Sequence, residues 1–221
     1  AYAVTTFTIL SNTILTQLKA YTFFSLAVLL LSSNYVFSQS PNKVISGFVS
    51  DAASNHPIRS ASIKNVFSVL EKVGHEDTLL VISAMGKTTN ALETVIKNYF
   101  EKSNELHASL QEVRKYHNQI LMDLFDDEEH DVFYAVNSHF ADLEYFIRSN
   151  KSPNYNFVYD QVVSYGEIIS TTIVSHYFNH AGLKNNWIDV RNFIKTDNNY
   201  RDAELDWEKT LIEDMVNTKM R

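Results

Sequence analysis

Hydroxyl-bearing side chains follow an apolar run of strand length in the first half of the chain. The run covers residues 78–83 and ends at Ser83, and the next segment contains Gly86, Thr88 and Thr89 before helical spacing begins. In open α/β sheets, ligands bind at the carboxyl ends of the strands, and the N-terminus of a following helix favours an anion. From the residues alone, we expect a strand–loop–helix turn that suits an anionic ligand.

A second candidate for a ligand-binding side chain is a carboxylate inside an apolar helical segment. Glu167 follows Gly166 and lies in a mostly apolar stretch between residues 162 and 169. An uncompensated carboxylate in such surroundings is costly. Glu167 therefore either pairs with a ligand or a base, or lies on the solvent-facing side of an amphipathic helix. The residues alone leave both interpretations open.

Two further groups carry side chains that bind metals. Five carboxylates lie within residues 126–131, and His176 and His180 are four residues apart on one helix face. Carboxylates can attract a divalent cation, and paired imidazoles can bind one. Acidic residues also favour the start of a helix and histidines its last turns. We expect this structural role, and no metal site, for both groups.

The composition limits the class of protein. The chain has 221 residues, with 26 acidic and 19 basic side chains and a formal net charge of −7. A general nucleic-acid binder needs a cationic surface, so we expect no nucleic-acid partner. The lack of cysteine excludes disulfides, thiolate zinc sites and cysteine nucleophiles. Only 5 glycines and 3 prolines are present, which favours a mostly helical chain.

Apolar spacing predicts the elements that position these side chains. The run at 78–83 suits a strand buried on both faces, as in a parallel sheet. Helical spacing begins near Ala61 and again after Gly86. We expect three long helices further on, at about 106–124, 132–147 and 157–180.

The last part of the chain predicts shorter elements. Gly182 is placed to end the preceding helix. Residues 186–191 and 193–196 have the pattern of short strands, and residues 203–216 that of a terminal helix. The coarse prediction is a mixed α/β fold with helix in excess.

The first 42 residues differ in composition from the rest, since Lys19 is their only charged residue. A basic residue followed by the apolar run at 20–31 is typical of a secretory signal peptide. The run is short for a membrane span, which needs roughly 20 apolar residues. Segment 1–42 is thus a signal-like leader, a membrane-associated segment, or a buried helix or mis-joined leader.

Residues 43–58 predict a strand followed by a turn. The patterns Ile45-Ser-Gly-Phe-Val-Ser-Asp and Asn55-His-Pro-Ile resemble the start of a carboxypeptidase-regulatory-like β-sandwich. The resemblance implies a module that often follows a signal peptide in secreted proteins.

Residues 59–221 resemble the N-terminal part of an aspartate kinase (aspartokinase) catalytic domain, of the amino-acid kinase family. Ser83-Ala-Met-Gly-Lys-Thr-Thr-Asn-Ala-Leu matches the family's Ser-Ala-Met-Gly-x-Thr-Thr-x-x-Leu signature, and Ser164-Tyr-Gly-Glu-Ile-Ile-Ser matches its Ser-x-Gly-Glu-x-x-Ser helix. Trp187-Ile-Asp-Val-Arg and Thr196-Asp match the strand and loop that follow. The fold implied by the resemblance is a partial αβα sandwich, helix-rich, behind an N-terminal leader foreign to the family.

The resemblance also implies an activity. Aspartokinases use ATP and Mg²⁺ to phosphorylate the β-carboxylate of L-aspartate, the first step towards lysine, threonine and methionine. Carried over residue by residue, Ser83, Thr89 and Glu167 bind aspartate: Glu167 pairs with the ammonium and the hydroxyls position the carboxylates. No catalytic residue is assigned.

Two departures from the family predict a polypeptide without kinase activity. The family's first strand carries Lys-Phe-Gly-Gly, which holds the ATP phosphates, whereas Ser46 stands in place of that lysine here. The family's nucleotide-binding half and regulatory ACT domains also come after the position of Arg221. Whether the chain is an enzyme is therefore left open.

The alternative is an exported or membrane-attached interaction protein that uses a kinase-like scaffold. The kinase resemblance predicts a cytoplasmic protein, whereas a working leader would export it or attach it to a membrane through residues 20–31. A third possibility is a join of two reading frames within residues 57–63, where the two resemblances meet. The oligomeric state is not predicted.

Overall fold

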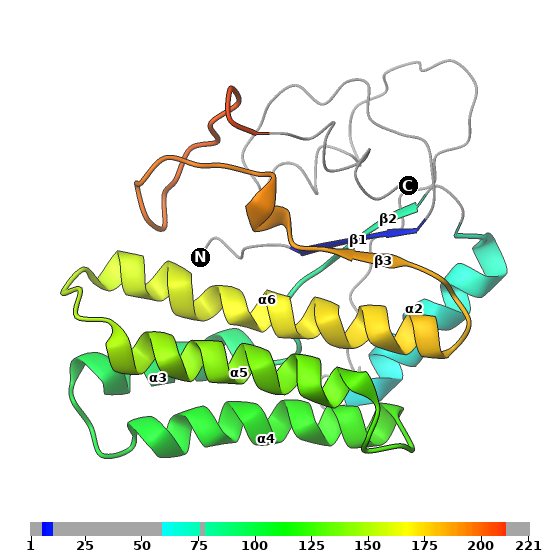
Figure 1. Cartoon of the computed structure of the whole chain (residues 1–221), viewed down its shortest axis with the longest axis horizontal. Helices are drawn as coiled ribbons and strands as arrows, with labels where there is room; N and C mark the ends of the chain where they lie inside the picture. Colours follow the sequence, from blue (N-terminus) through cyan, green and yellow to red (C-terminus); the bar gives the residue numbers. More distant parts are fainter. Residues whose placement is uncertain (1–5, 11–58, 76–77, 211–221) are drawn as a thin grey trace, which may run out of the picture.

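The structure, a computed structural model, describes residues 6–10, 59–75 and 78–210 (Figure 1). The signal-like run at 20–31 and the strand-and-turn segment at 43–58 lie outside the described residues. So do residues 211–216 of the expected terminal helix.

Five helices of the described part confirm the helical predictions. They are α2 (Arg59–Val73), α3 (Thr88–Phe100), α4 (Leu106–Leu124), α5 (Asp131–Ser149) and α6 (Tyr155–His180). α2 to α5 each have an apolar stripe at helical spacing that faces the core, whereas α6 is buried on nearly all sides.

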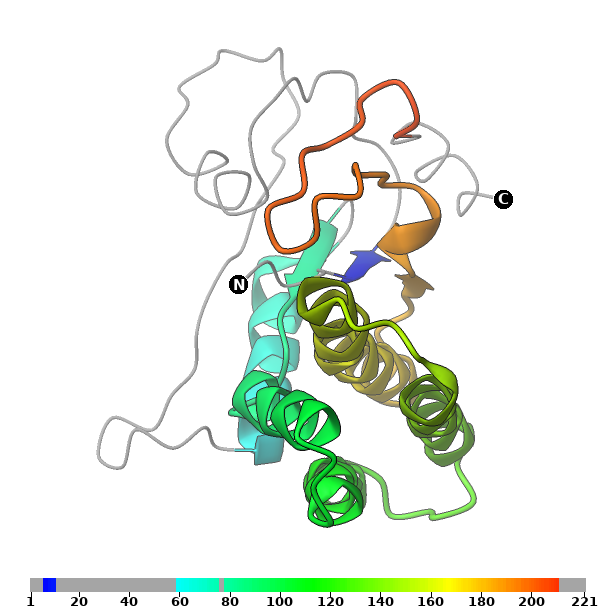
Figure 2. The same cartoon turned by 90° about the vertical axis from the view of Figure 1, so that its left-hand side faces the viewer.

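Helices α3, α4, α5 and α6 pack as a bundle, with α6 next to the sheet and α4 farthest from it (Figures 1 and 2). α3 contacts both α4 and α6, and α5 packs on the other side of α6. Their shared core contains the fully buried Leu92, Phe140, Ile169 and Phe178. Burial of large apolar side chains drives this packing, so α6, which is buried along most of its length, has a fixed position.

Local capping interactions mark both ends of α6. The Asn154 side chain accepts a hydrogen bond from the N–H of Phe157 at the N-terminus. At the C-terminus Gly182 has φ +96°, and the N–H of Leu183 donates to the Phe178 carbonyl. This confirms that Gly182 ends the helix. Within the described ranges, no helix combines the length and the apolar character needed to cross a membrane.

A small sheet lies on one side of the helical layer, with the order β2-β1-β3. The central strand β1 (Thr6–Leu10) pairs antiparallel with β2 (Thr78–Ile82) and with β3 (Asn186–Ile188). β2 and β3 consequently run parallel to each other but do not touch. The predicted parallel sheet is therefore wrong for the described strands, because the strand between them comes from residues 6–10 and runs the opposite way.

The prediction that the run at 78–83 forms a strand buried on both faces is also wrong for β2. Thr78 and Leu80 are buried against the helices, whereas Leu79 and Val81 are 36% and 47% exposed. The described helices lie on one side of the sheet, and the 190–210 loop runs on the other (Figure 2). The described part is helix-rich, with its helices on one side of the sheet, and it does not confirm the αβα sandwich.

The segment after β3 is less regular than its pattern predicted. β3 ends at Ile188, and a short 3₁₀ turn, Val190–Asn192, replaces the rest of the expected strand. The expected strand at 193–196 is reduced to an isolated bridge between Thr196 and Leu205.

The prediction of a terminal helix is wrong over residues 203–210, which form turns and a bridge. The N–H of Asp206 donates to the Lys195 carbonyl, and the N–H of Lys195 donates to the Thr210 hydroxyl. These bonds link the loop to itself across ten to fifteen residues, so the backbone groups are not available for helical pairing.

Candidate functional site

The loop after β2 places two of the three predicted hydroxyls at one corner. Gly86 has φ +56°, a left-handed conformation that favours glycine. Ser83 is exposed at the end of β2, and Thr89 is half-buried in the first turn of α3. Thr88 was wrongly expected to face a ligand. It is buried, and its hydroxyl donates to the Met85 carbonyl over 2.6 Å.

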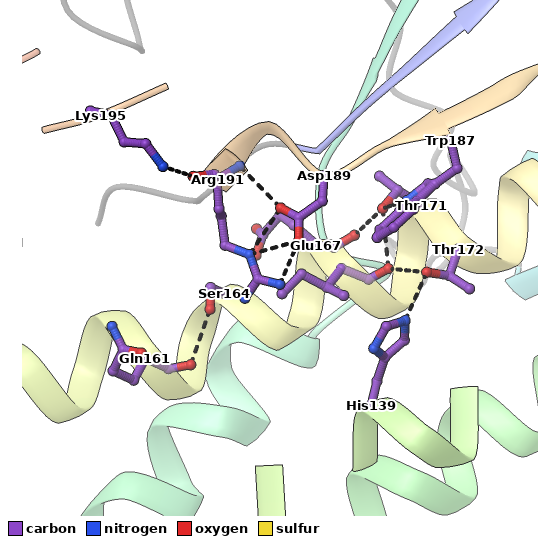
Figure 3. Close-up of polar contacts among 11 residues, drawn as sticks. His139, Gln161, Ser164, Glu167, Thr171, Thr172, Trp187, Asp189, Arg191 and Lys195 are labelled. Atoms are coloured by element: carbon purple, nitrogen blue, oxygen red, sulfur yellow. Dashed lines mark hydrogen bonds and ion pairs between the residues drawn. The ribbon is translucent and has the colours of Figure 1, made fainter. Parts of the chain in front are cut away.

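Glu167 lies fully buried on α6, against this loop (Figure 3). Its Oε1 accepts a hydrogen bond from the N–H of Ala84 over 3.4 Å. Its Oε2 is buried and has no hydrogen-bond partner within the described residues. Burial raises the pKa of Glu167 to about 7, although hydrogen bonds from its own N–H and from Ala84 oppose the rise. The solvent-facing interpretation is therefore excluded.

Two features hold α6 close to the loop. The Ser170 hydroxyl donates to the Ser83 carbonyl over 2.6 Å. Gly166 leaves room for the loop, because a Cβ atom there would lie only 3.0 Å from the Cβ of Ala84. The structure thus brings Ser83 and Glu167 to the same corner. In the described part, no hydrogen bond joins the side chains of Ser83, Thr89 and Glu167 to one another.

A hydrogen-bond network on the far side of Glu167 anchors its helical turn (Figure 3). The Thr171 hydroxyl donates to the Glu167 carbonyl over 2.7 Å and accepts from the Trp187 indole N–H over 3.0 Å. The Thr172 hydroxyl donates to the Ile168 carbonyl, so the His139 Nε2, 3.1 Å from that hydroxyl, must be the donor to it. These bonds tie α6 to β3 and α5. Sequence reasoning missed them because they join distant residues.

Asp189 and Arg191 form an ion pair at the turn after β3. Arg191 Nη2 lies 2.6 Å from Asp189 Oδ2, and Nε lies 2.9 Å from Asp189 Oδ1. Figure 3 shows the Arg191 side chain extending from this turn toward α6. Sequence reasoning gave Arg191 no role, although a guanidinium is suited to binding a carboxylate.

The two paired histidines have a third imidazole beside them. The ring centroid of His130 lies 6.0 Å from that of His176 and 5.3 Å from that of His180. His130 caps α5, because its Nδ1 accepts from the N–H of Val132. Residues 126–129 form an exposed turn just before α5. Across the described ranges, no three His, Cys, Asp or Glu side chains are arranged to hold a metal ion.

The described residues show neither a cluster of metal ligands nor a phosphate-loop pattern. No carboxylate or histidine group among them suits a metal ion. The 83–88 loop has one glycine, whereas a phosphate loop has a second glycine five residues earlier, where Val81 stands. The corner around Glu167 is therefore a small polar site with one buried carboxylate and an uncapped helix end.

A hollow with a volume of about 530 Å³ lies elsewhere on the surface. It lies between α3 and the start of α6, and its walls include Phe100, Tyr155, Tyr159 and Arg201. Glu167 does not line it. The chemistry of Glu167 and the loop, not the size of a hollow, identifies the candidate site.

Comparison with known proteins identifies an aspartokinase-like region. The chain is 29% identical over 132 residues to bifunctional aspartokinase/homoserine dehydrogenase 2 of Escherichia coli (strain K12). It is 28% identical over 141 residues to the chloroplastic bifunctional aspartokinase/homoserine dehydrogenase 1 of Arabidopsis thaliana. These matches cover 60% and 61% of this chain but only 16% and 15% of the relatives.

The other comparisons add no match. No family model matches the chain, so the resemblance of residues 43–58 to a β-sandwich module gains no support. No solved structure matches the chain. The aspartokinase-like similarity is distant, and the chain spans about one sixth of the length of the relatives.

Proposed function

We propose that the corner formed by the 83–88 loop and α6 binds L-aspartate as an aspartokinase-like substrate site. The observation that carries the proposal is the buried Glu167 carboxylate whose Oε2 has no partner within the described residues. An ammonium suits this oxygen because it supplies both a positive charge and a hydrogen-bond donor. The similarity to aspartokinase-containing enzymes supports aspartate as the ligand.

The opposite end of the ligand is anionic and faces the loop and the start of α3. Lys87 is the N-cap of α3, and no side chain caps the helix. The helix end therefore keeps donors for a carboxylate, with a favourable dipole. In this arrangement Glu167 takes the ammonium, while the Ser83 and Thr89 hydroxyls position the carboxylates.

We propose binding without turnover for this polypeptide. In the family that it resembles, ATP phosphorylates the β-carboxylate of aspartate with Mg²⁺. Here Ser46 stands in place of the phosphate-binding lysine, and the 83–88 loop lacks the second glycine of a phosphate loop. A coupled ADP-release assay with L-aspartate and Mg-ATP should show no turnover. Turnover of about 1–100 per second, the usual kinase range, would contradict this.

Calorimetric titration of the full chain tests the binding proposal from the ligand side. L-aspartate should bind, and succinate, which has both carboxylates but no ammonium, should bind at least about tenfold more weakly. L-alanine, which lacks the second carboxylate, should also bind more weakly. Equal binding of succinate and L-aspartate, or no binding of L-aspartate, would overturn the proposal.

The location that accompanies this function is cytoplasmic. The alternative, an exported or membrane-attached interaction protein, depends on residues 20–31, outside the described part. Cell fractionation followed by N-terminal sequencing separates the two. Uncleaved protein in the cytoplasm supports the proposal, and a cleaved, exported product supports the alternative.

A further inference from the structure

The hollow between α3 and the start of α6 has an aromatic wall. Its volume of about 530 Å³ is in the range of sites for small molecules, roughly 300–1,000 Å³. The ring centroids of Phe100 and Tyr155 are 5.3 Å apart, and those of Tyr155 and Tyr159 are 6.2 Å apart. Tyr159 is 2% exposed, whereas Tyr155 is 43% exposed and has ring surface free for contact. The wall therefore suits a flat, apolar ring.

Arg201 lies at the end of this aromatic row, next to Tyr159. Its Cζ is 4.3 Å from the centroid of the Tyr159 ring, a distance at which a guanidinium stacks on an aromatic face. The backbone N–H of Arg201 donates to Asp160 Oδ2 over 2.9 Å, which ties this turn to α6. Arg201 has φ +67°, a left-handed conformation that is uncommon for a residue with a side chain. Such backbone angles are concentrated at functional sites, which supports a role for the Arg201 side chain.

Lys97 adds a second cation, from α3. Lys97 and Arg201 are both exposed, and both line the hollow. Within the described residues, neither of them forms an ion pair with a carboxylate. The planar guanidinium of Arg201 can bind a carboxylate through two parallel hydrogen bonds. The two cations therefore suit an anionic group on a ligand.

Glu93 and Glu101 limit the charge of that anion, because both also line the hollow. Burial raises the pKa of Tyr159 to about 12, so its hydroxyl keeps the proton and donates it to Glu93 Oε1 over 2.7 Å. The charges of the two glutamates cancel those of Lys97 and Arg201. A group with one negative charge is accommodated here, whereas a phosphate with two would be repelled by the glutamates.

We propose that the hollow is a second binding site, for a small aromatic carboxylate. The flat ring stacks on Tyr155 beside Phe100, and the carboxylate binds the Arg201 guanidinium. The positive charge of Lys97 adds to the attraction. Glu167 does not line the hollow, so L-aspartate binding at the corner and occupancy of the hollow are separate properties.

Calorimetric titration of the full chain with three probes separates the ring from the anion. Indole-3-acetate has both a flat ring and a carboxylate and should bind. Indole-3-acetamide keeps the ring without the charge, and acetate has the charge without the ring. Each should bind at least about tenfold more weakly than indole-3-acetate. Equal binding of indole-3-acetate and its amide, or no binding of indole-3-acetate, would overturn the inference.

Adenosine monophosphate tests the choice of a carboxylate over a phosphate. It combines a flat ring with a group that carries up to two negative charges, so it should bind more weakly than indole-3-acetate. Tighter binding of adenosine monophosphate would overturn the assignment.

Arg201→Gly tests the anion-binding group and keeps the backbone angles, since glycine adopts positive φ readily. It should raise the Kd for indole-3-acetate about tenfold or more and leave that for indole-3-acetamide within about twofold. Lys102→Gly is the matched control, because Lys102 is also an exposed cation at positive φ, +51°, and does not line the hollow. It should leave both Kd values unchanged. An equal rise in the two variants would show general attraction by surface charge and overturn the inference.

Tyr155 tests the aromatic wall. Tyr155→Phe keeps the ring and should change the Kd for indole-3-acetate by no more than about twofold. Tyr155→Leu keeps an apolar side chain without a ring and should raise the Kd about fivefold. Equal Kd values for the two variants would overturn the stacking on which the assignment depends. Thermal unfolding of each variant confirms that the full chain is folded before titration.

Discussion

The Glu167 carboxylate lies against the backbone N–H of Ala84, with Oε1 3.4 Å from the nitrogen and Oε2 without a partner in the described part. A buried carboxylate with one oxygen unpaired is costly in its charged form, and the pKa of Glu167 is raised for this reason.

Stability should fall as the pH rises, because of Glu167. Its pKa is about 7 in the folded chain, against an ordinary value of 4.5. The folded state therefore binds the proton more tightly, and stability is lost between pH 4.5 and 7, by up to about 3 kcal/mol.

Glu167→Gln should stabilise the chain at pH 8 and have little effect at pH 4.5. Denaturant unfolding at both pH values measures this, with the exposed Glu112→Gln as control. An equal effect at both values contradicts the assignment.

Adding a methyl group at Gly166 should push α6 away from the loop. A Cβ there lies 3.0 Å from the Cβ of Ala84, which is tighter than nine in ten Cβ contacts, so Ala84 must shift by a few tenths of an ångström. Gly166→Ala should cost about 1–3 kcal/mol through overpacking, despite the better helix propensity of alanine. Adding Ala84→Gly should recover most of the loss in the free energy of unfolding. Failure of the second change to rescue the first would show that the two residues are not in contact.

Mild acid should loosen the contact between the start of α5 and the end of α6. Burial and nearby His130 lower the pKa of His176, while Asp131 opposes this. His180 also lies beside His130. Since the pKa of His176 is lowered, its stabilising contribution is present above pH 6.5 and lost as the pH falls below that value.

His130→Asn tests this cluster, because asparagine keeps a capping acceptor and removes one imidazole. The stability lost between pH 7 and pH 5 should shrink by about 1 kcal/mol. The exposed His107→Asn serves as control and should leave the loss unchanged. An undiminished loss in His130→Asn means that the cluster is not the acid-sensitive element.

Removing the Thr171 hydroxyl should free the indole of Trp187. Thr171→Val leaves the indole N–H without its 3.0 Å partner and should cost about 1–3 kcal/mol. The tryptophan emission should change, with Trp207, which is 45% exposed, as the unaffected second fluorophore. Thr94→Val removes a comparable hydroxyl on an exposed face and should leave the emission unaltered. Identical spectra for wild type and Thr171→Val would exclude this contact in solution.

The helices could be predicted from the sequence, and the sheet could not. Apolar spacing over α3 to α6 is long and regular, so the pattern alone locates each helix within a few residues. The run at 78–82 is equally apolar on both faces, and its pattern cannot tell one-sided from two-sided burial. Its actual partner, Thr6–Leu10, lies about seventy residues away, in a segment that local patterns assign to a leader. Long-range pairing of this kind leaves no local signal.

The sequence indicated which residues lie at this corner but not how their side chains are oriented. Ser83 and Glu167 do meet at one corner, whereas Thr88, one residue before Thr89, faces the interior because the helical turn rotates it by about 100°. His117 had no sequence signal, since a histidine on an apolar helix face is ordinarily a core residue. Its contact with the Thr88 hydroxyl depends on the packing of α3 against α4.

The most direct test compares L-aspartate binding by wild type, Glu167→Gln and Glu112→Gln at pH 8, where Glu167 is ionised. Titration calorimetry on the full chain gives the Kd of each. The charge of Glu167 should contribute at least about tenfold to affinity, so Glu167→Gln should bind that much more weakly while Glu112→Gln matches wild type. Glu167→Gln that binds L-aspartate as tightly as wild type would contradict the account.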